Sequence, residues 1–289
     1  MFLPAHADAP PQDPAAAPVG EMRLVPVAGT VRQLPWHPGH AIAMVHSFQE
    51  DDLAGPAWEC CPRSALARVL RQAQDQHGLT IKAGFESEFV LLHKKSQQAQ
   101  QRPGSLPAPL DQSNYCQSSA LDAAAEVLDA LGEALHGLGI EVEQVHPESA
   151  PGQFEVAVRY RDAIQACDEA LLTREAIVGV AASDGLLASF LPKLWPDAAG
   201  NGCHVHFSVW QGDSNLLAPA GRPAISSGQG RQQLLQLPPT GEAFLAGVLD
   251  HLPALLCLTT PSPNSYRWVG GQGTGVGQPV VSQWAVDGM

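Results

Sequence analysis

The alternation of apolar and polar residues along the chain predicts β-strands, because successive side chains of a strand point to opposite faces. The clearest stretch is residues 80–92, where Phe85 and Phe89 share one face and Glu86 and Glu88 the other. The remaining strand-like stretches are residues 22–26, 30–36, 41–48, 140–145, 187–193 and 203–209.

Apolar residues that recur every three or four positions predict helices over residues 64–78, 118–139, 162–182 and 241–258. Glycines end the first two, and the pair Pro261 and Pro263 ends the fourth. The positions expected to face the core are Leu66, Val69, Leu70 and Ala73, then Leu121, Ala124, Val127, Leu128, Leu131 and Leu135, then Ile164, Leu171, Leu172, Ile177 and Val178.

The segments outside these elements divide the chain. Residues 1–19 are rich in alanine and proline and are expected to form a disordered tail. Residues 22–48 are expected to form a small sheet with turns at Ala28-Gly29 and Pro38-Gly39. Residues 94–113 are polar and rich in glutamine and proline, which indicates a loop or mobile insertion. Residues 277–289 are expected to form a C-terminal tail.

Composition excludes some classes of protein. A formal charge of −13 over 289 residues argues against a nucleic-acid partner, which would need a basic face. The six cysteines form no CxxC pair, so reduced thiols and a cytoplasmic location are expected. No apolar run reaches the length of a membrane span, and residues 1–20 lack the features of a secretory signal.

Two pairs of glutamates and one pair of histidines are the candidate chemistry. Glu86 and Glu88 would repel each other on one strand face, and a divalent cation would offset the repulsion. The alternative is two solvated glutamates on an edge strand. A Pro151-Gly152 turn would set Glu148 and Glu155 across a hairpin from each other.

His204 and His206 follow a glycine turn and share one strand face, which suits a metal or an anionic ligand; the alternative is an exposed strand pair. Carboxylates with one imidazole favour Mg²⁺ or Mn²⁺. Lys193 and Arg267 could supply positive charge near phosphates. No P-loop is present, and no GxGxxG follows a strand, so a nucleotide would bind in another fold.

The motifs together resemble glutamine synthetase of the class I type, in the family's order, over about residues 20 to 276. They are Gly84–Phe89, Glu148–Glu155, Phe190–Lys193, Gly200–Ser208 and Asn264–Arg267. The resemblance implies an α+β fold, with a partial β-grasp domain over residues 20–60. Residues 61–276 would form a catalytic domain with a curved antiparallel sheet and flanking helices, which lacks its C-terminal part.

The resemblance also implies the reaction and its participants. ATP phosphorylates the side-chain carboxylate of glutamate, and ammonia or an amine displaces phosphate from the acyl phosphate. Subunits of the family assemble into rings, so a homo-oligomer is expected, with no nucleic-acid or membrane partner.

Residue roles follow from the same resemblance. Glu88, Glu148 and Glu155 would hold one Mg²⁺ or Mn²⁺, and Glu86 and His204 the other. Nucleotide and phosphate contacts would come from Lys193, His206 and Ser208, substrate contacts from Gly200 and Asn264, and catalysis from His206 and Arg267.

Two departures from the family pattern leave two functional hypotheses. Trp268 stands where the family has an arginine, and the family's further C-terminal motifs, with their arginines and a last metal ligand, have no counterpart. The first hypothesis is an ATP-dependent ligase that forms glutamine or a γ-glutamyl amide. The alternative is a catalytically impaired or inactive truncated member with a metal-binding, structural or interaction role.

Overall fold

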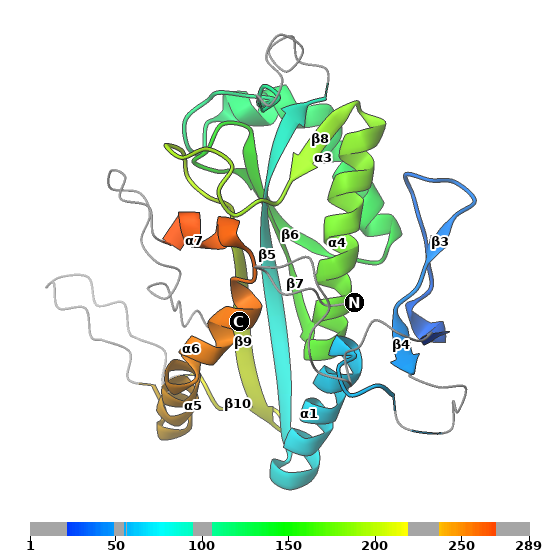
Figure 1. Ribbon diagram of the computed structural model, residues 1–289, viewed down its shortest axis with the longest axis vertical. Coiled ribbons are helices and arrows are strands. Elements are labelled where there is room, and N and C mark those ends of the chain that lie inside the picture. Colours follow the sequence, from blue (N-terminus) through cyan, green and yellow to red (C-terminus); the bar gives the residue numbers. More distant parts are fainter. Residues whose placement is uncertain (1–21, 49–54, 56, 95–105, 219–236, 270–289) are drawn as a thin grey trace, which may run out of the picture.

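A computed structural model describes residues 22–48, 55, 57–94, 106–218 and 237–269 (Figure 1). The tails expected at residues 1–19 and 277–289 lie outside the described residues, as does most of the insertion expected at residues 94–113. The boundary expected between residues 60 and 61 remains a prediction.

The N-terminal strands form two separate pairs rather than one sheet. β1 (Arg23–Pro26) pairs with β4 (Val45–Phe48), and β2 (Arg32–Gln33) pairs with β3 (Ala41–Ile42). The strand expected over residues 30–36 is wrong beyond β2, because the chain turns there and Leu34 N donates a hydrogen bond to His40 O. A 3₁₀ turn, η2 (Ala28–Thr30), precedes β2.

The N-terminal strands dock on the helices of the larger part. The indole of Trp36 covers Gly179 so closely that a Cβ at this glycine would collide with the ring. Arg32 Nε donates a hydrogen bond of 3.1 Å to Leu138 O. These contacts join the two parts in the described region.

A curled antiparallel sheet forms the centre of the molecule (Figure 1). Its main path runs β10 (Ser214–Asn215), β9 (Cys203–Gln211), β5 (Leu79–His93), β7 (Gln153–Asp162) and β6 (Val142–Pro147). β8 (Leu186–Ser189) pairs with the end of β5. Because β5 has neighbours on both sides, the alternative of an edge strand for Glu86 and Glu88 is wrong.

Two strands share one edge of β5. β9 pairs with residues 79–87 of β5, and β8 pairs with residues 90–93. Between them, Gly202 O accepts a hydrogen bond of 3.2 Å from Glu88 N, so the glycine turn continues the pairing. The strand expected over residues 187–193 ends at Ser189, because Phe190 leaves the sheet and its ring lies 6.0 Å from that of Phe89.

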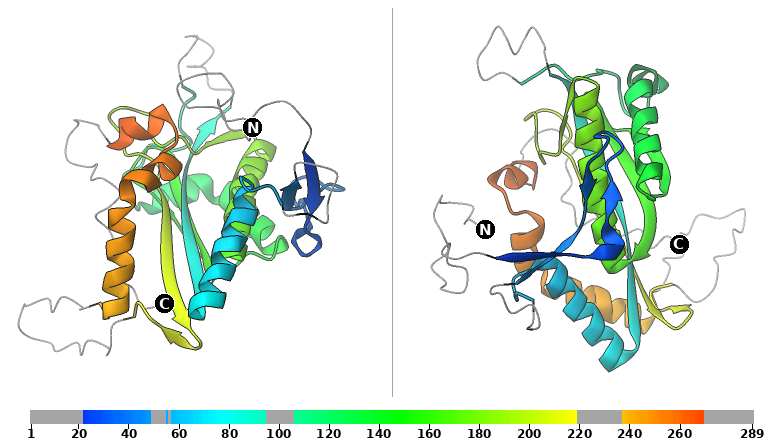
Figure 2. Two further views of the ribbon diagram at one scale, coloured as in Figure 1. Left: turned by 60° about the horizontal axis from the view of Figure 1, so that its bottom comes forward. Right: turned by 90° about the vertical axis from the view of Figure 1, so that its right-hand side faces the viewer.

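Helices α3 (Ser118–Gly137) and α4 (Ala163–Ser183) cover one face of the sheet (Figure 2). Leu135 and Ile177 from these helices pack with Phe89, Phe154 and Val156 of the sheet to form the core. α1 (Pro62–His77) packs beside the lower part of β5 and ends at Gly78, whose φ is 64°. The predicted helices 64–78, 118–139 and 162–182 are confirmed, with shifts of a few residues at their ends.

Some positions expected to face the core are exposed. They are Val69 (58% exposed), Leu121 (38%), Leu171 (56%) and Val178 (44%). Much of the contact surface of α3 and α4 is instead formed by alanines, such as Ala124 and Ala176. The expectation was wrong because it assigned only large apolar residues to the core, whereas close packing of a helix on a sheet also uses small residues.

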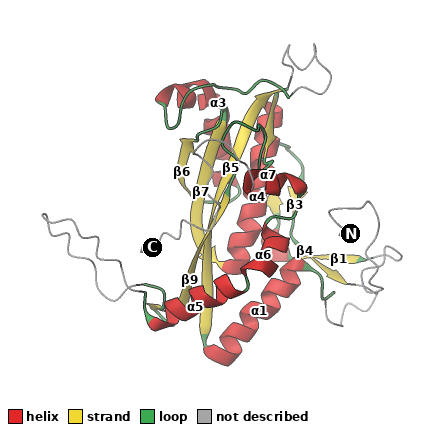
Figure 3. Cartoon of the chain, turned by 60° about the vertical axis from the view of Figure 1, so that its left-hand side comes forward, coloured by secondary structure: helices red, strands yellow, loops and turns green. Residues whose placement is uncertain are grey.

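The helix expected over residues 241–258 is two helices, α5 (Pro239–Asp250) and α6 (Leu252–Thr259), which meet at a bend of 68°. Pro253 explains the bend, since it offers no N–H to the preceding turn and its ring crowds that turn. α7 (Pro263–Val269) follows the predicted break, and the three helices lie on the side of the sheet away from α3 and α4 (Figures 2 and 3).

No single helix in the described residues is long and apolar enough to cross a membrane; α5 and α6 meet that criterion only as a bent pair.

Candidate functional site

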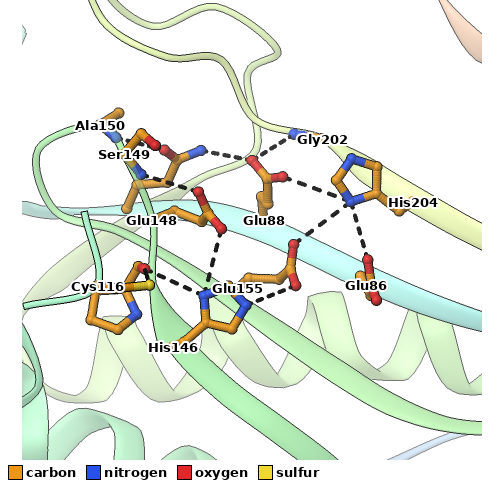
Figure 4. Close-up of polar contacts among 12 residues, drawn as sticks. Glu86, Glu88, Cys116, His146, Glu148, Ser149, Ala150, Glu155, Gly202 and His204 are labelled. Atoms are coloured by element: carbon orange, nitrogen blue, oxygen red, sulfur yellow. Dashed lines mark hydrogen bonds and ion pairs between the residues drawn. The ribbon is translucent and has the colours of Figure 1, made fainter. Parts of the chain in front are cut away.

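Three neighbouring strands bring the predicted acidic and histidine residues onto the sheet face opposite α3 and α4. β5 carries Glu86 and Glu88. The strand register sets Glu88 opposite Glu155 of β7, and Glu86 opposite His204 of β9. Because all four side chains point to the same face, they converge in space (Figure 4). Glu88 and Glu155 are buried, with 8% and 7% of their surface exposed.

The imidazole of His204 stands among three carboxylates. Its Nδ1 lies 3.2 Å from Glu86 Oε2, 3.7 Å from Glu155 Oε2 and 3.9 Å from Glu88 Oε1. His206 Nε2 lies 3.0 Å from the other oxygen of Glu86 as an ion-pair contact, without the alignment of a hydrogen bond. Single ligand atoms of Glu86, Glu155 and His204 lie within 4.8 Å of one another, a spacing that fits one metal ion.

A second group of possible ligands adjoins the first through Glu155. His146 Nε2 lies 3.1 Å from Glu155 Oε1, and His146 Nδ1 lies 3.5 Å from Glu148 Oε1. These three residues also have ligand atoms within 4.8 Å of one another. The hairpin between β6 and β7, expected from Pro151-Gly152, therefore brings Glu148 and Glu155 to one imidazole.

Burial and mutual repulsion set the electrostatics of the carboxylates. Burial raises the pKa of Glu88 to about 7, against the opposing effect of the Gly202 N–H, which donates to its carboxylate. Burial, together with the charge of Glu155, also raises the pKa of Glu148. A hydrogen bond from His204 lowers the pKa of Glu86.

The pKa of His204 rises to about 10, because its ring hydrogen-bonds to Glu155 and Glu86. A proton on His204 therefore partly offsets the negative charge of the cluster. A divalent cation held by the same carboxylates would supply that positive charge instead, and an imidazole ligand must then be neutral. The donor set, oxygen-rich with imidazole, fits a hard cation such as Mg²⁺ or Mn²⁺.

The other predicted site residues lie around this cluster with partners of their own. Lys193 Nζ donates to Ala198 O. Asn264 forms two hydrogen bonds with the Lys193 backbone, of 2.7 Å to its N–H and 2.9 Å to its carbonyl. The Asn264 side chain thus holds the backbone of residue 193 through one bond at each of its polar atoms.

Gly200, Ser208 and Arg267 differ in their placement. Gly200 lies in the turn beside Glu88, Ser208 is buried on β9 and accepts a hydrogen bond of 2.9 Å from Trp210 Nε1, and Arg267 is exposed on α7. No ion pair joins Arg267 to the described part of the chain. The roles assigned to these residues remain predictions.

The sequence reading missed His146 and Gln153. His146 precedes Glu148 by two positions and pairs with Glu155 across the hairpin, so strand alternation and register together could have indicated it. Gln153 gave no such signal, because its importance depends on contacts with residues 88 and 200 that are distant in sequence.

Solved structures with similar folds are known. The chain superposes on "GmaS/ADP complex-Conformation 1" with a TM-score of 0.72 and 29% identity, over 86% of this chain and 54% of the other. For "Crystal structure of novel glutamine synthase homolog" the TM-score is 0.70 and the identity 32%, over 86% and 54%. The fold is therefore that of the glutamine synthetases, a curled antiparallel sheet with flanking helices.

Sequence relatives agree with the fold. Type-1 glutamine synthetase 1 of Dictyostelium discoideum is 31% identical over 86% of this chain and 49% of its own length. Gamma-glutamylpolyamine synthetase GlnA3 of Streptomyces coelicolor is 35% identical over 88% and 50%. The chain thus spans about half the length of the curated relatives it matches.

Fold and site together place the chain in a class of proteins whose members are ATP- and divalent-metal-dependent ligases. Residues 59–288 match the family described as "Glutamine synthetase, catalytic domain". The chain belongs to the glutamine synthetase family, and the resemblance inferred from its motifs is confirmed. Members of this family act on small-molecule substrates, and they typically oligomerise.

Proposed function

We propose that this chain provides the metal-binding and nucleotide-binding part of a ligase that joins glutamate to ammonia or an amine through an acyl phosphate. The observation that supports it most is the convergence of four glutamates with His204 on one sheet face. Glu88 and Glu155 are buried there with few positive charges in contact. Two buried carboxylates held together are costly without a cation.

The residues divide into two proposed sets of ligands. By the family pattern, Glu88, Glu148 and Glu155 would hold one Mg²⁺ or Mn²⁺, and Glu86 and His204 would hold the other; Glu155, which belongs to both close groups of ligand atoms, would lie between the two ions. Such cations neutralise the phosphates of ATP when bound. The chain's own part is to orient the ligands: Gly202 N–H fixes Glu88 at 2.9 Å, and the ring of His146 fixes Glu155 at 3.1 Å.

The remaining groups would act on the organic substrates. His206 and Ser208 follow His204 at alternate positions of β9, so they continue the same face toward the expected nucleotide. Gly200 would present backbone to glutamate. Lys193 Nζ donates one hydrogen bond to Ala198 O, and its remaining N–H groups and its charge would serve a phosphate. The choice between ammonia and an amine stays open, and the similarity to a γ-glutamylpolyamine synthetase supports testing both. We also propose that the chain forms a homo-oligomer, because members of the family typically oligomerise.

The test is glutamate-dependent release of phosphate from ATP by the purified chain with Mg²⁺, with ammonia and then with a polyamine as acceptor. The Glu88→Ala variant is the control. The proposal predicts release by the parent chain that falls at least about 100-fold in the variant, as is usual when an electrostatic contributor is removed. Equal rates for the two proteins would exclude the ligase activity.

A second candidate is a family member that binds metal but is catalytically impaired. One observation favours it: Trp268 occupies a position where the family pattern has an arginine. Fixed positive charge for a transferring phosphate is then scarce in the described chain. Tight Mn²⁺ binding without glutamate-dependent phosphate release would support this candidate over the first.

A further inference from the structure

Gln153 occupies a buried position at the start of β7, with 2% of its surface exposed. Its side-chain oxygen accepts a hydrogen bond of 2.8 Å from Ala150 N–H. That backbone donor fixes the orientation of the amide, so the side-chain nitrogen must point the other way, toward Glu88 and the glycine turn.

Three acceptors surround this side-chain nitrogen. Nε2 lies 2.8 Å from Glu88 Oε2, 2.9 Å from Gly200 O and 2.9 Å from Asn201 Oδ1. An amide nitrogen carries only two N–H groups. The three bonds therefore compete, and the bond to Glu88 is made at the expense of one of the two bonds to the turn.

Asn201 extends these contacts beyond the turn. Its side-chain nitrogen donates to Ser189 O at 3.2 Å and to Leu191 O at 3.0 Å, and its backbone N–H donates to Pro192 O at 2.9 Å. The amide groups of Gln153 and Asn201 thus form a chain of bonds from Glu88 to the segment that follows β8. Buried polar groups in such a network are costly to leave unpaired.

The turn packs closely against the candidate site at Gly202. A Cβ added at Gly202 would lie 2.9 Å from Glu88 Oε1 and 3.0 Å from His204 Nε2. The backbone of the turn therefore packs directly against two proposed metal ligands. A change in the position of the Glu88 carboxylate must be met by a change in the turn or in the bonds of Gln153.

We propose that Gln153 is a positioning residue that couples cation binding at Glu88 to the conformation of the Gly200–Gly202 turn, the backbone expected to receive the amino-acid substrate. This inference rests on the proposed function. A cation that binds Glu88 Oε1, the oxygen that faces His204, withdraws electron density from the carboxylate and so weakens its bond with Gln153. The two N–H groups of Gln153 then serve Gly200 O and Asn201 Oδ1, and the turn becomes more rigid.

Two variants separate the steps of this coupling. Gln153→Met keeps length and burial but removes every polar contact of the side chain. Asn201→Ala leaves the contact between Gln153 and Glu88 and removes the link to Ser189 and Leu191. Thr173→Val is the matched control, since it also removes a buried hydrogen bond, of 2.8 Å to Glu169 O on α4, away from the site.

The measurements are Mn²⁺ affinity, from the electron paramagnetic resonance signal of the free ion, and hydrogen exchange, with and without Mn²⁺, at the backbone amide of residue 201, which donates to Pro192 O and not to Glu88. In the parent chain and in Thr173→Val, Mn²⁺ should slow this exchange. Gln153→Met should bind Mn²⁺ about 10 to 100 times more weakly, the usual effect of losing a partner of a metal ligand. At saturating Mn²⁺ its turn should show no added protection.

Asn201→Ala should keep its Mn²⁺ affinity within about threefold, because its change lies beyond the ligand's own partners, yet lose the Mn²⁺-dependent protection of the backbone amide of residue 201. The inference is overturned if either variant shows the parent's protection at saturating Mn²⁺. A parent chain that binds no Mn²⁺ would overturn the proposed function as well. If the parent chain binds Mn²⁺ but both variants keep the parent's protection of the turn, the coupling alone is overturned and the proposed function stands.

Discussion

At the scale of single residues, Glu88 has the most informative environment, because its carboxylate is buried among other carboxylates yet receives hydrogen bonds at one oxygen. Both Gly202 N–H and Gln153 Nε2 donate to Oε2. These two bonds are insufficient to offset burial, and the pKa of Glu88 stays at about 7. In the metal-free protein, ionisation of Glu88 is thus a cost to the folded state.

The sign of the resulting pH dependence follows from linkage. The pKa of Glu88 is higher in the folded chain than its ordinary value of 4.5, so protonated Glu88 favours folding. This contribution is fully present below about pH 4.5, and it is lost as the pH rises through 7.

Glu88→Gln should therefore stabilise the metal-free chain at pH 8 and have little effect at pH 4. An amide oxygen in the place of Oε2 can still accept both hydrogen bonds. The gain should be about 3 to 4 kcal/mol at pH 8, since the pKa of about 7 lies about 2.5 units above 4.5 and one pKa unit corresponds to about 1.4 kcal/mol. Urea unfolding of both proteins with chelator present measures it. The same variant should bind Mn²⁺ at least about tenfold more weakly; a loss of stability at pH 8 would contradict the account.

At the scale of elements, the β6–β7 hairpin is held against β5 by its turn. Leu91 N donates to Gly152 O at 2.8 Å, and a Cβ at Gly152 would lie 2.7 Å from Leu91 O. Gly152 also has a φ of 66°, which disfavours other residues. Position and conformation both require glycine here, and the turn sets how Glu148 and Glu155 face each other.

Gly152→Ala should lower the free energy of unfolding by about 2 to 4 kcal/mol, the sum of a left-handed backbone penalty and a collision with backbone. Gly185→Ala is a suitable control, because Gly185 has a φ of 72° but open space around its Cα. It should cost only about 1 to 2 kcal/mol. Denaturant unfolding compares them, and equal losses would show that the contact with Leu91 contributes nothing.

The sequence predicted these elements well where a local pattern encodes them and poorly elsewhere. Alternation placed Glu86 and Glu88 on one face, and the Pro151-Gly152 pair predicted the hairpin. His146 and Gln153 were missed because their contacts depend on strand register. Leu171 and Val178 were assigned to the core, but their exposure depends on which side of α4 meets the sheet. Register and helix rotation are set by tertiary packing, which a single sequence encodes only indirectly.

At the scale of the whole molecule, a formal charge of −13 adds to the repulsion within the site. Cation binding should consequently stabilise the entire chain, because a ligand that binds only the folded state raises its stability. Mn²⁺ at 100 times its dissociation constant should raise the free energy of unfolding by about 2.7 kcal/mol. Thermal unfolding with Mn²⁺, with chelator, and with NaCl at matched ionic strength measures this. If NaCl raises the stability as much as Mn²⁺ does, the stabilisation comes from general screening of charge and not from binding at the site.

The shared edge of β5 has a consequence for how the molecule comes apart. β8 holds residues 90–93 beside the core, whereas β9, which carries His204, holds residues 79–87. β9 is flanked on its outer side by the two-residue β10 in the described chain. We therefore expect β9 to open locally at a lower free energy than the α3–α4 core, and hydrogen exchange at its amides measures this. The free energy of opening β9 and the free energy of global unfolding would then differ. Under conditions between the two, the core would be folded while the ligands of the site would no longer be held together.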